Sequence, residues 1–280
     1  MNRILAHLLP VCVILVSNLR ADETTTISEA KRDDTGFLVH EVRSSYQAGT
    51  TLIRVLQPDT LLNDKKYPVI YLLPVEAGRE NRYGDGLSEV KKLDLQNKFG
   101  AVFVAPTFSH LPWYADHPTN PEIRQESFFV KAVVPFIDKN YPVRAEAEAR
   151  LLLGFSKSGW GAWSLLLRHP DTFGKAVAWD APLMMDKPGI YGSGDIFGTA
   201  DNFENYRVSK LLEDNADKFS NETENRLVLL GYGNFRAEHV RVHALMDKLK
   251  ITHEYRDGPE RKHDWHSGWV NEAVQLLLGQ

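Results

Sequence analysis

The feature that most constrains this chain is an apolar run that ends at a serine and passes at once into a helix-like segment. It reads Arg150-Leu-Leu-Leu-Gly-Phe-Ser156-Lys-Ser-Gly-Trp-Gly161. Residues 150–155 have the continuous apolar character of a strand buried in a parallel sheet, and residues 160–168 are compatible with a helix that His169-Pro170 closes. A turn this sharp strains the backbone at the bend and lifts the side chain there above the sheet. The segment therefore predicts an accessible serine hydroxyl.

Strand-like and helix-like segments alternate along the rest of the chain. Apolar or β-branched runs predict strands over residues 37–42, 51–56, 68–73, 101–105, 175–179, 226–230 and 252–256. Helices are predicted over 87–99, 126–139 with a bend at Pro135, 236–248 and 270–278, and residues 181–224 are predicted to be irregular. Parallel strands need helical crossovers, so we expect an α/β fold: one domain over 36–280, its mostly parallel sheet covered by helices on both faces.

The N-terminus has the pattern of a signal peptide. Arg3 precedes an apolar run from Ile4 to Val16, and small or polar residues lead to Ala21. The run is too short for a convincing membrane span, so residues 1–21 are predicted to be cleaved and the mature chain to be secreted or periplasmic, without stable membrane insertion. Residues 22–35 are polar and rich in threonine, and we expect a flexible leader there.

Composition excludes some chemistry and some partners. The single cysteine, Cys12, lies in the predicted signal peptide, so the mature chain is expected to have neither disulfides nor thiolate ligands. Of the 33 basic residues, Arg3 and Arg20 lie in that segment as well, which leaves 31 against 37 acidic residues and a net charge of −6. A mildly acidic surface has no electrostatic reason to bind phosphate backbones, so nucleic acid is not an expected partner.

An accessible serine becomes a nucleophile only when a base takes its proton, and histidine is the usual base near neutral pH. In folds of this class the serine is followed in the chain by an acid and then by the histidine. Lys262-His263-Asp264-Trp265-His266 lies between the last predicted strand and the last predicted helix, where this base belongs. His263 and His266 are both candidates.

Several motifs together resemble one known family. They are Tyr67-Pro68-Val69-Ile70-Tyr71-Leu72-Leu73, the serine turn followed by Gly161-Ala162, His169-Pro170 with Phe173, and His263-Asp264-Trp265. From about Thr51 to its end the chain resembles the esterase D branch of the α/β hydrolases, which includes S-formylglutathione hydrolases, feruloyl and acetylxylan esterases, siderophore esterases and mycolyltransferases. The resemblance implies an α/β-hydrolase fold, Ser156 as nucleophile, His263 as base and no cofactor.

The acid departs from the family pattern. After the strand 226–230 such enzymes carry an acid in a Gly-x-x-Asp pattern, and here Gly231-Tyr232-Gly233 is followed by Asn234. An asparagine can orient an imidazole but supplies no negative charge for the imidazolium. Asp180, which ends the preceding strand at the same sheet edge, is an equal candidate, and Glu238 is a third.

The oxyanion formed on attack needs preorganised N–H donors. The backbone amide of Lys157, directly after the serine, is one expected donor. The second is expected from the loop after Leu73, where related esterases carry His-Gly and this chain has Pro74-Val75-Glu76. Proline has no N–H, so Val75 or Glu76 is the candidate.

Two further groups bear on ligands. Trp113, Tyr114, Asp116 and His117 follow the end of a strand, at the edge where open α/β sheets bind ligands, and their aromatic and polar groups suit sugar rings or phenolic acids. The alternative is that the aromatic pair plugs the core. His239 and His243 are four residues apart and could share a metal, but no acidic or cysteine ligand nearby completes a set, so no metal site is predicted.

The sequence thus predicts a secreted serine esterase that cleaves a carboxylic ester through an acyl-enzyme on Ser156, with a small-molecule or polysaccharide substrate whose ester is carbohydrate-linked. Two alternatives remain open. A non-catalytic carbohydrate-binding or scaffold protein could retain this fold after losing its acid, as the asparagine at 234 suggests. An acyltransferase would use the same intermediate with an alcohol as acceptor.

Overall fold

The computed structural model describes residues 24–220 and 223–279. The predicted signal peptide, residues 1–21, lies outside this range. Among the described residues, no helix has both the length and the apolar character that crossing a bilayer requires.

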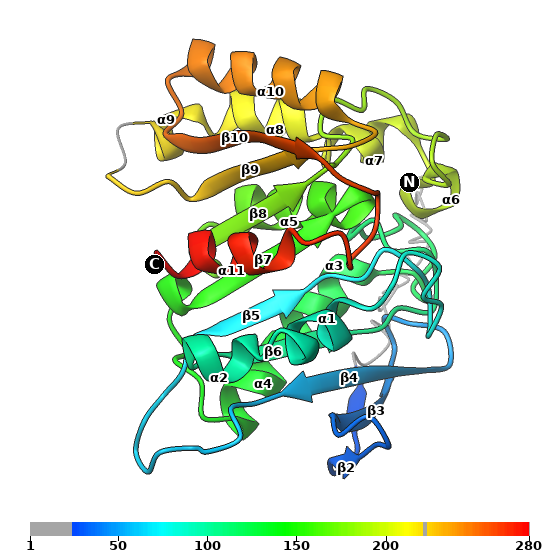
Figure 1. The fold of residues 1–280 in the computed structure, drawn as a ribbon. Helices are drawn as coiled ribbons and strands as arrows, with labels where there is room; N and C mark the ends of the chain where they lie inside the picture. Colours follow the sequence, from blue (N-terminus) through cyan, green and yellow to red (C-terminus); the bar gives the residue numbers. More distant parts are fainter. Residues whose placement is uncertain (1–23, 221–222, 280) are drawn as a thin grey trace, which may run out of the picture.

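A ten-stranded sheet forms the centre of the described chain (Figure 1). Its order is β1-β3-β4-β6-β5-β7-β8-β9-β10, with β2 paired to β3. The bounds are β1 Thr25–Ile27, β2 Lys31–Arg32, β3 Leu38–Ser44, β4 Thr50–Leu56, β5 Val69–Leu72, β6 Val102–Pro106, β7 Arg150–Phe155, β8 Lys175–Trp179, β9 Leu227–Tyr232 and β10 His253–Glu260. From β6 to β10 every neighbouring pair is parallel, whereas β1 to β4 pair antiparallel with their neighbours.

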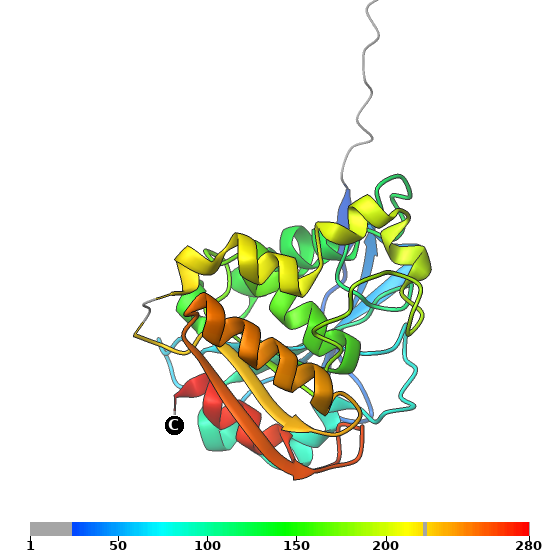
Figure 2. The same ribbon diagram turned by 90° about the horizontal axis from the view of Figure 1, so that it is seen from above.

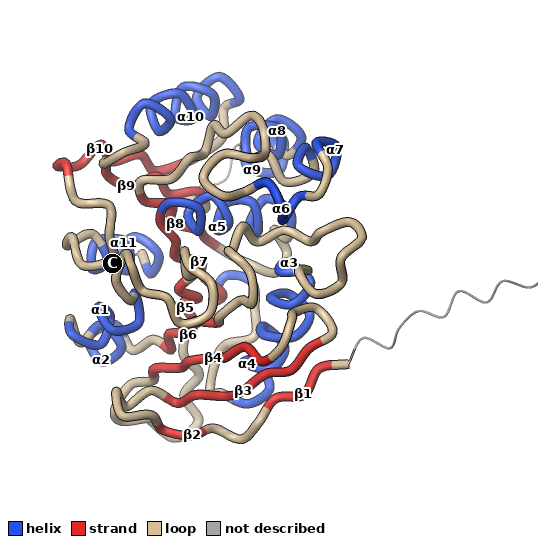
Figure 3. Tube along the Cα trace, turned by 90° about the vertical axis from the view of Figure 1, so that its right-hand side faces the viewer, coloured by secondary structure: helices blue, strands red, loops and turns tan. Residues whose placement is uncertain are grey.

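Helices cover both faces of the sheet (Figures 2 and 3). One apolar cluster lies under α1 Gly86–Lys92, α2 Leu95–Phe99 and α11 Val270–Leu278. The other lies under α3 Gln125–Phe128, α4 Val134–Asn140, α5 Ser156–Arg168, α6 Gly194–Phe197, α7 Ala200–Glu204, α8 Val208–Asp214, α9 Ala216–Phe219 and α10 Arg236–Leu249. Parallel strands need this double cover because their side chains are apolar on both faces. The predicted α/β architecture is confirmed.

The structure differs from the predicted helices and from the predicted irregular segment in three places. The helix expected over 87–99 breaks at Asp94, whose φ of 55° separates α1 from α2. The helix expected over 126–139 contains a π-helical turn, Phe129–Val133, just before Pro135. Proline lacks an N–H and clashes with the carbonyl four residues earlier, so a wider turn accommodates it. The segment 181–224, predicted to be irregular, contains the short helices α6 to α9.

Part of the segment expected to be a flexible leader, residues 22–35, forms two short strands. Thr25–Ile27 and Lys31–Arg32 both pair with β3 in antiparallel register. Apart from Ile27 their side chains are polar, so they show no apolar alternation, but an edge strand with one solvated face needs little of it. Backbone hydrogen bonds to β3 order this segment.

Register places two candidate site residues side by side. Phe155 at the end of β7 pairs with Trp179 at the end of β8, so Ser156 and Asp180 follow neighbouring positions. The amide of Ser156 donates to the backbone oxygen of Asp180 at 3.2 Å. Both lie at the carboxyl ends of parallel strands, where open α/β sheets bind their ligands.

A buried carboxylate ties α3 to the end of α5. Glu126 accepts hydrogen bonds from Arg168 at 2.8 and 3.0 Å, from His169 at 2.6 Å and from the hydroxyl of Tyr206 at 2.9 Å. Burial alone would raise the pKa of Glu126, but the hydrogen bonds from His169 and Arg168 outweigh it and lower the pKa to about 2. The carboxylate is therefore ionised at neutral pH and holds the two helices together.

We expect this carboxylate to make stability fall in acid. The unfolded state binds the proton near pH 4.5 and the folded state only near pH 2, so the contribution is fully present above pH 4.5 and is lost as pH falls towards 2. A shift of this size corresponds to about 3 kcal/mol. The free energy of unfolding of the wild type, measured with urea, should exceed that of Glu126→Gln above pH 4.5. This difference should shrink as pH falls from 4.5 to 2. A difference that stays constant over this range would contradict the expectation.

Candidate active site

Ser156 occupies a strained turn between β7 and α5. Its φ is 52°, in the left-handed region that side chains other than glycine seldom adopt, and such strain costs about 1–3 kcal/mol. The residue before it is in extended conformation and the residues after it are helical. Ser156 is half-buried, so its hydroxyl is accessible.

Close packing under the turn explains its small residues. A β-carbon on Gly154 would lie 2.2 Å from the backbone oxygen of Ser158, and one on Gly159 would lie 2.8 Å from the β-carbon of Ala181. Ser158 stands where this kind of motif usually has its last glycine. It is buried, and its hydroxyl donates to the oxygen of Phe155 at 2.9 Å and accepts from the amide of Phe155 at 3.1 Å. The departure in the motif thus closes the turn with hydrogen bonds.

Asp180 is a fully buried carboxylate at the end of β8. It accepts the backbone amides of Gly233 at 3.1 Å, Asn234 at 2.9 Å and Phe235 at 2.7 Å. Burial works to raise the pKa of Asp180, but the hydrogen bonds from His263 and from the Phe235 and Asn234 amides lower it overall. The site therefore contains a fixed negative charge.

His263 is hydrogen-bonded to this carboxylate. Its Nδ1 lies 2.5 Å from Oδ2 of Asp180, and its ring packs edge-on against Phe155, with centroids 5.1 Å apart. Donation from Nδ1 leaves the lone pair on Nε2. Among the described residues neither Nε2 nor the hydroxyl of Ser156 has a hydrogen-bond partner. Hydrogen bonds between catalytic groups are often long before substrate binds, and both atoms are available to one.

Of the three candidate acids, the structure brings only Asp180 to a candidate histidine. Asn234 contributes its backbone amide to Asp180, and its side chain makes no hydrogen bond within the described chain. Glu238 accepts from the amide of Met184 at 2.8 Å. A β-carbon on Gly233 would lie 2.4 Å from Oδ2 of Asp180, so the bare glycine makes room for the carboxylate beside the loop where the family carries its own acid.

The second candidate base is engaged elsewhere. Nδ1 of His266 lies 2.7 Å from Oε2 of Glu89, a buried carboxylate on α1. The His266 ring covers Gly84, where a β-carbon would lie 2.5 Å from it. This histidine therefore joins its loop to α1.

Two residues that sequence reasoning missed support the candidate pair. His239, considered only as a metal ligand, is buried, accepts from the amide of Ala181 at 2.9 Å and bonds Gly231 O at 3.0 Å. Burial lowers its pKa to about 4, so it is neutral, and it joins Ala181, directly after Asp180, to Gly231 in β9. Tyr83 packs edge-on against His263 at 5.6 Å. Neither position carries a motif that could have indicated it.

The predicted oxyanion donors lie at the turn and in the loop after β5. The amide of Lys157 is in the first turn of α5, where N–H groups have no acceptor within the helix. The amides of Val75 and Glu76 make no hydrogen bond within the described chain. The ammonium of Lys157 donates to the backbone oxygen of Val75 at 3.1 Å and so joins the two segments, and its burial lowers the pKa of Lys157.

Trp113 and Tyr114 lie in the core, as the second of the two interpretations of this pair expected, and not on a ligand-binding surface. Trp113 is fully buried against Trp160, and Tyr114 is 1% exposed and covers Gly161, where a β-carbon would lie 2.0 Å from its ring. Apolar ring area is more stable in the core than facing solvent. The hydroxyl of Tyr114 donates to the oxygen of Pro74 at 2.6 Å, so this ring supports the loop that carries the candidate oxyanion donors.

Asp116 and His117 line an open pocket of about 440 Å³ that includes neither Ser156 nor His263. Asp116 accepts from the amide and the hydroxyl of Ser127 at 2.9 and 2.5 Å. These hydrogen bonds give the Asp116 carboxylate a role in the local structure.

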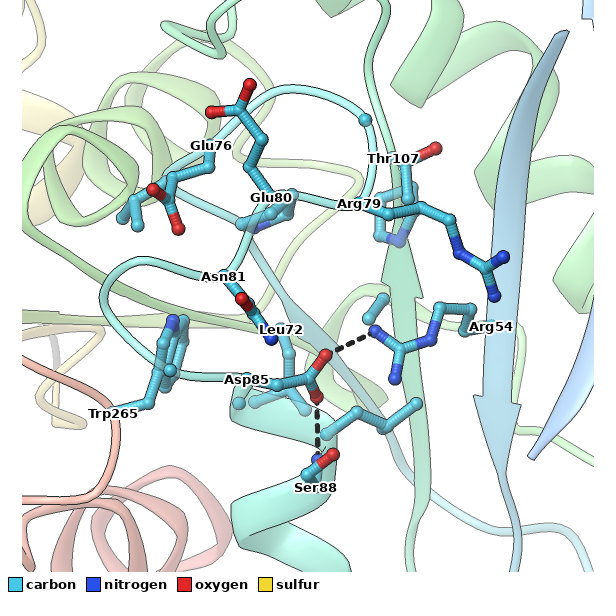
Figure 4. A pocket seen from close by; sticks show the side chains of 18 of the residues that line it. Arg54, Leu72, Glu76, Arg79, Glu80, Asn81, Asp85, Ser88, Thr107 and Trp265 are labelled. Carbon is cyan, nitrogen blue, oxygen red and sulfur yellow. Dashed lines mark hydrogen bonds and ion pairs between the residues drawn. The ribbon is translucent and has the colours of Figure 1, made fainter. Parts of the chain in front are cut away.

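A second pocket, of about 280 Å³, borders the candidate site (Figure 4). Its wall includes the loop with Val75 and Glu76, and also Trp265, two residues after His263. Figure 4 shows the ion pair between Arg54 and Asp85 at its far side, at 2.6 Å. Most of its labelled side chains are charged or polar: Arg54, Glu76, Arg79, Glu80, Asn81, Asp85, Ser88 and Thr107.

The sheet order, the double helical cover and the strained serine define an α/β hydrolase, and comparison with solved structures agrees. A ferulic acid esterase superposes with a TM-score of 0.64 at 20% identity, covering 92% of this chain and 98% of that one. S-formylglutathione hydrolase from Agrobacterium tumefaciens gives 0.70 at 14% identity, covering 90% and 98%. The fluorophosphonate-binding serine hydrolase FphF of Staphylococcus aureus gives 0.66 at 13%, covering 91% and 98%.

The family follows from the sequence itself. Residues 44–210, more than half of the chain, match the family described as "Putative esterase", and the protein belongs to that family. Esterase Rv1288 of Mycobacterium tuberculosis is 26% identical over 134 residues, which are 46% of this chain. The match spans only 29% of that relative's length. Family membership supports an esterase and confirms the predicted resemblance.

Proposed function

We propose that this protein is a secreted serine esterase that hydrolyses carboxylic esters through an acyl-enzyme on Ser156. The observation that carries the proposal is the 2.5 Å hydrogen bond between His263 and the buried Asp180, next to a serine with a φ of 52°. Secretion rests on the signal-peptide pattern of residues 1–21.

The chemistry follows from these positions. Nε2 of His263 accepts the proton of the Ser156 hydroxyl as its oxygen attacks the ester carbonyl carbon. The oxyanion accepts hydrogen bonds from the amide of Lys157 and from that of Val75 or Glu76. His263 then gives its proton to the leaving alcohol, and the acyl group stays on Ser156. Water, deprotonated by the same nitrogen, attacks the acyl-enzyme, and the acid leaves as the hydroxyl of Ser156 regains its proton.

Asp180 orients His263 and stabilises its protonated form. Its carboxylate accepts the Nδ1 proton, which keeps the Nε2 lone pair free, and it stabilises the imidazolium formed during each half-reaction. The amides of residues 233–235 hold the carboxylate in place. A non-catalytic protein that had lost its acid would have no reason to retain a buried charge at this point.

We propose that the alcohol part of the ester is polar. The 280 Å³ pocket beside the candidate oxyanion loop offers guanidinium, carboxylate and amide groups from Arg79, Glu80 and Asn81. Such groups hydrogen-bond to hydroxyls, as a carbohydrate-linked ester would require. An acyltransferase would differ only in the acceptor, so product analysis with an added sugar alcohol separates transfer from hydrolysis.

A fluorophosphonate probe tests the nucleophile. The wild type should be labelled at Ser156, as peptide mass spectrometry would show, because only an activated serine attacks the phosphorus. Ser156→Ala should abolish labelling. The matched control is Ser88→Ala, which removes a hydroxyl from the wall of the neighbouring pocket and should leave labelling intact. A folded wild-type chain that stays unlabelled would favour the non-catalytic alternative.

A further inference from the structure

Away from the candidate active site, α10 and the edge strand β10 bring three potential metal ligands together. His243 and Asp247 are one turn apart on α10, and His253 begins β10, which lies beside that helix (Figure 1). One ligand atom from each residue can be chosen so that all three lie within 4.8 Å of one another. Nδ1 of His243 is 2.8 Å from Nε2 of His253, which is 3.9 Å from Oδ1 of Asp247.

The two imidazoles are held in orientation by outer contacts. Nδ1 of His253 lies 2.8 Å from the backbone oxygen of Ile251, to which it donates, and this leaves the Nε2 lone pair directed into the cluster. The His253 side chain is only 7% exposed. The ring of His243 packs on Tyr255, with centroids 4.4 Å apart. A hydrogen bond from the non-ligating nitrogen to a carbonyl is the arrangement that metal-ligating histidines typically have.

We propose that His243, Asp247 and His253 bind a divalent transition metal ion, with Zn²⁺ the best match. Two imidazoles, one carboxylate and a water make a common tetrahedral zinc set. Zinc–ligand distances of about 2.0–2.2 Å put tetrahedral ligand atoms about 3.3–3.6 Å apart. Nδ1 of His243 and Nε2 of His253 are hydrogen-bonded at 2.8 Å, and Nε2 of His253 is 3.9 Å from Oδ1 of Asp247, so these two separations lie on both sides of that value. Small side-chain rotations would admit the ion.

This site revises the sequence prediction that no metal site exists. The helical pair considered there was His239 with His243, and His239 is occupied by two buried hydrogen bonds. The actual cluster combines a helical pair with a strand residue beyond the turn at residues 250–252, which only the packing of β10 against α10 brings together.

The position indicates a structural ion. It would fasten the edge strand β10 to α10, the helix that also carries His239, whose ring bonds Ala181 next to Asp180 and Gly231 in β9. Since an ion that binds only the folded state raises its stability, the chain should melt at a higher temperature when zinc is present. No step of the proposed ester hydrolysis uses this ion.

The test uses the full chain after treatment with EDTA. Calorimetric titration with ZnCl₂ should give one site per chain, and the melting temperature should rise with zinc concentration. Co²⁺ should give the visible absorption of a tetrahedral complex. His253→Ala should remove the absorption and the zinc-dependent shift, and Asp247→Asn should weaken binding at least tenfold. His110→Ala, a histidine outside the cluster, is the control and should behave as the wild type.

Variants of individual histidines also distinguish zinc binding at this cluster from zinc binding elsewhere on the chain. The absorption should persist in His263→Ala, which removes the imidazole of the candidate active site. If His253→Ala and His243→Ala are folded without metal and still bind zinc with the stoichiometry and affinity of the wild type, the proposal is overturned. Absence of zinc binding to the wild type in the micromolar range overturns it as well.

Discussion

Replacing His263 by alanine should lower kcat for ester hydrolysis by about 10⁶, the scale of losing the general base of a serine hydrolase. The reason is that Ser156 keeps its proton when no lone pair is available to accept it. The measurement is steady-state hydrolysis of a chromogenic ester, with thermal melting to establish that the variant folds. KM should change much less than kcat, since the imidazole acts in the transition state.

His266→Ala is the matched control for this experiment. It removes an imidazole from the same loop, together with its 2.7 Å hydrogen bond to Glu89. We expect a modest loss of stability and a kcat within tenfold of the wild type. Severe inactivation of His266→Ala, with an active His263→Ala, would reassign the base and refute the assignment made from the Asp180 contact.

The second large effect concerns the acid. Asp180→Asn should lower kcat by about 10⁴, because an asparagine facing Nδ1 favours the wrong imidazole tautomer and supplies no charge. The variant also places an NH₂ group among backbone amides that now donate to a carboxylate, so it should unfold at a lower temperature. Activity is therefore measured well below the melting temperature of the variant.

Asn234→Ala is the control for Asp180. The asparagine contributes only its backbone amide to the carboxylate, and alanine retains that amide. The variant should keep activity within a few-fold. If Asn234→Ala instead lost as much activity as Asp180→Asn, the acid would have to be sought in the loop after β9, where the family pattern puts it.

The fold and the strained serine could be predicted because both are local patterns. The apolar run of residues 150–155 and the small residues after it require a strand followed closely by a helix. The acid could not be settled in this way. Asp180 and Asn234 both follow strands at the same sheet edge, and only the structure shows which side chain reaches His263.

Other features depended on packing that no local pattern reveals. The residue types of Trp113 and Tyr114 do not reveal whether their rings face a substrate or the core. Their burial becomes visible only once α5 is packed over them. The strands at residues 25–27 and 31–32 have one apolar residue between them, Ile27, and both form backbone ladders with β3 that no local pattern indicates. The cluster of His243 and His253 similarly requires the helix and the strand to be placed first.

The bare α-carbon at Gly233 has an evolutionary consequence. Because any side chain there would overlap the carboxylate of Asp180, positions 180 and 233 cannot vary independently. A chain with an acid at position 180 therefore requires a residue without a side chain at position 233. Screens that search for an acidic residue only after β9 would discard such chains as inactive, whereas a paired search for aspartate at one position and glycine at the other would recover them.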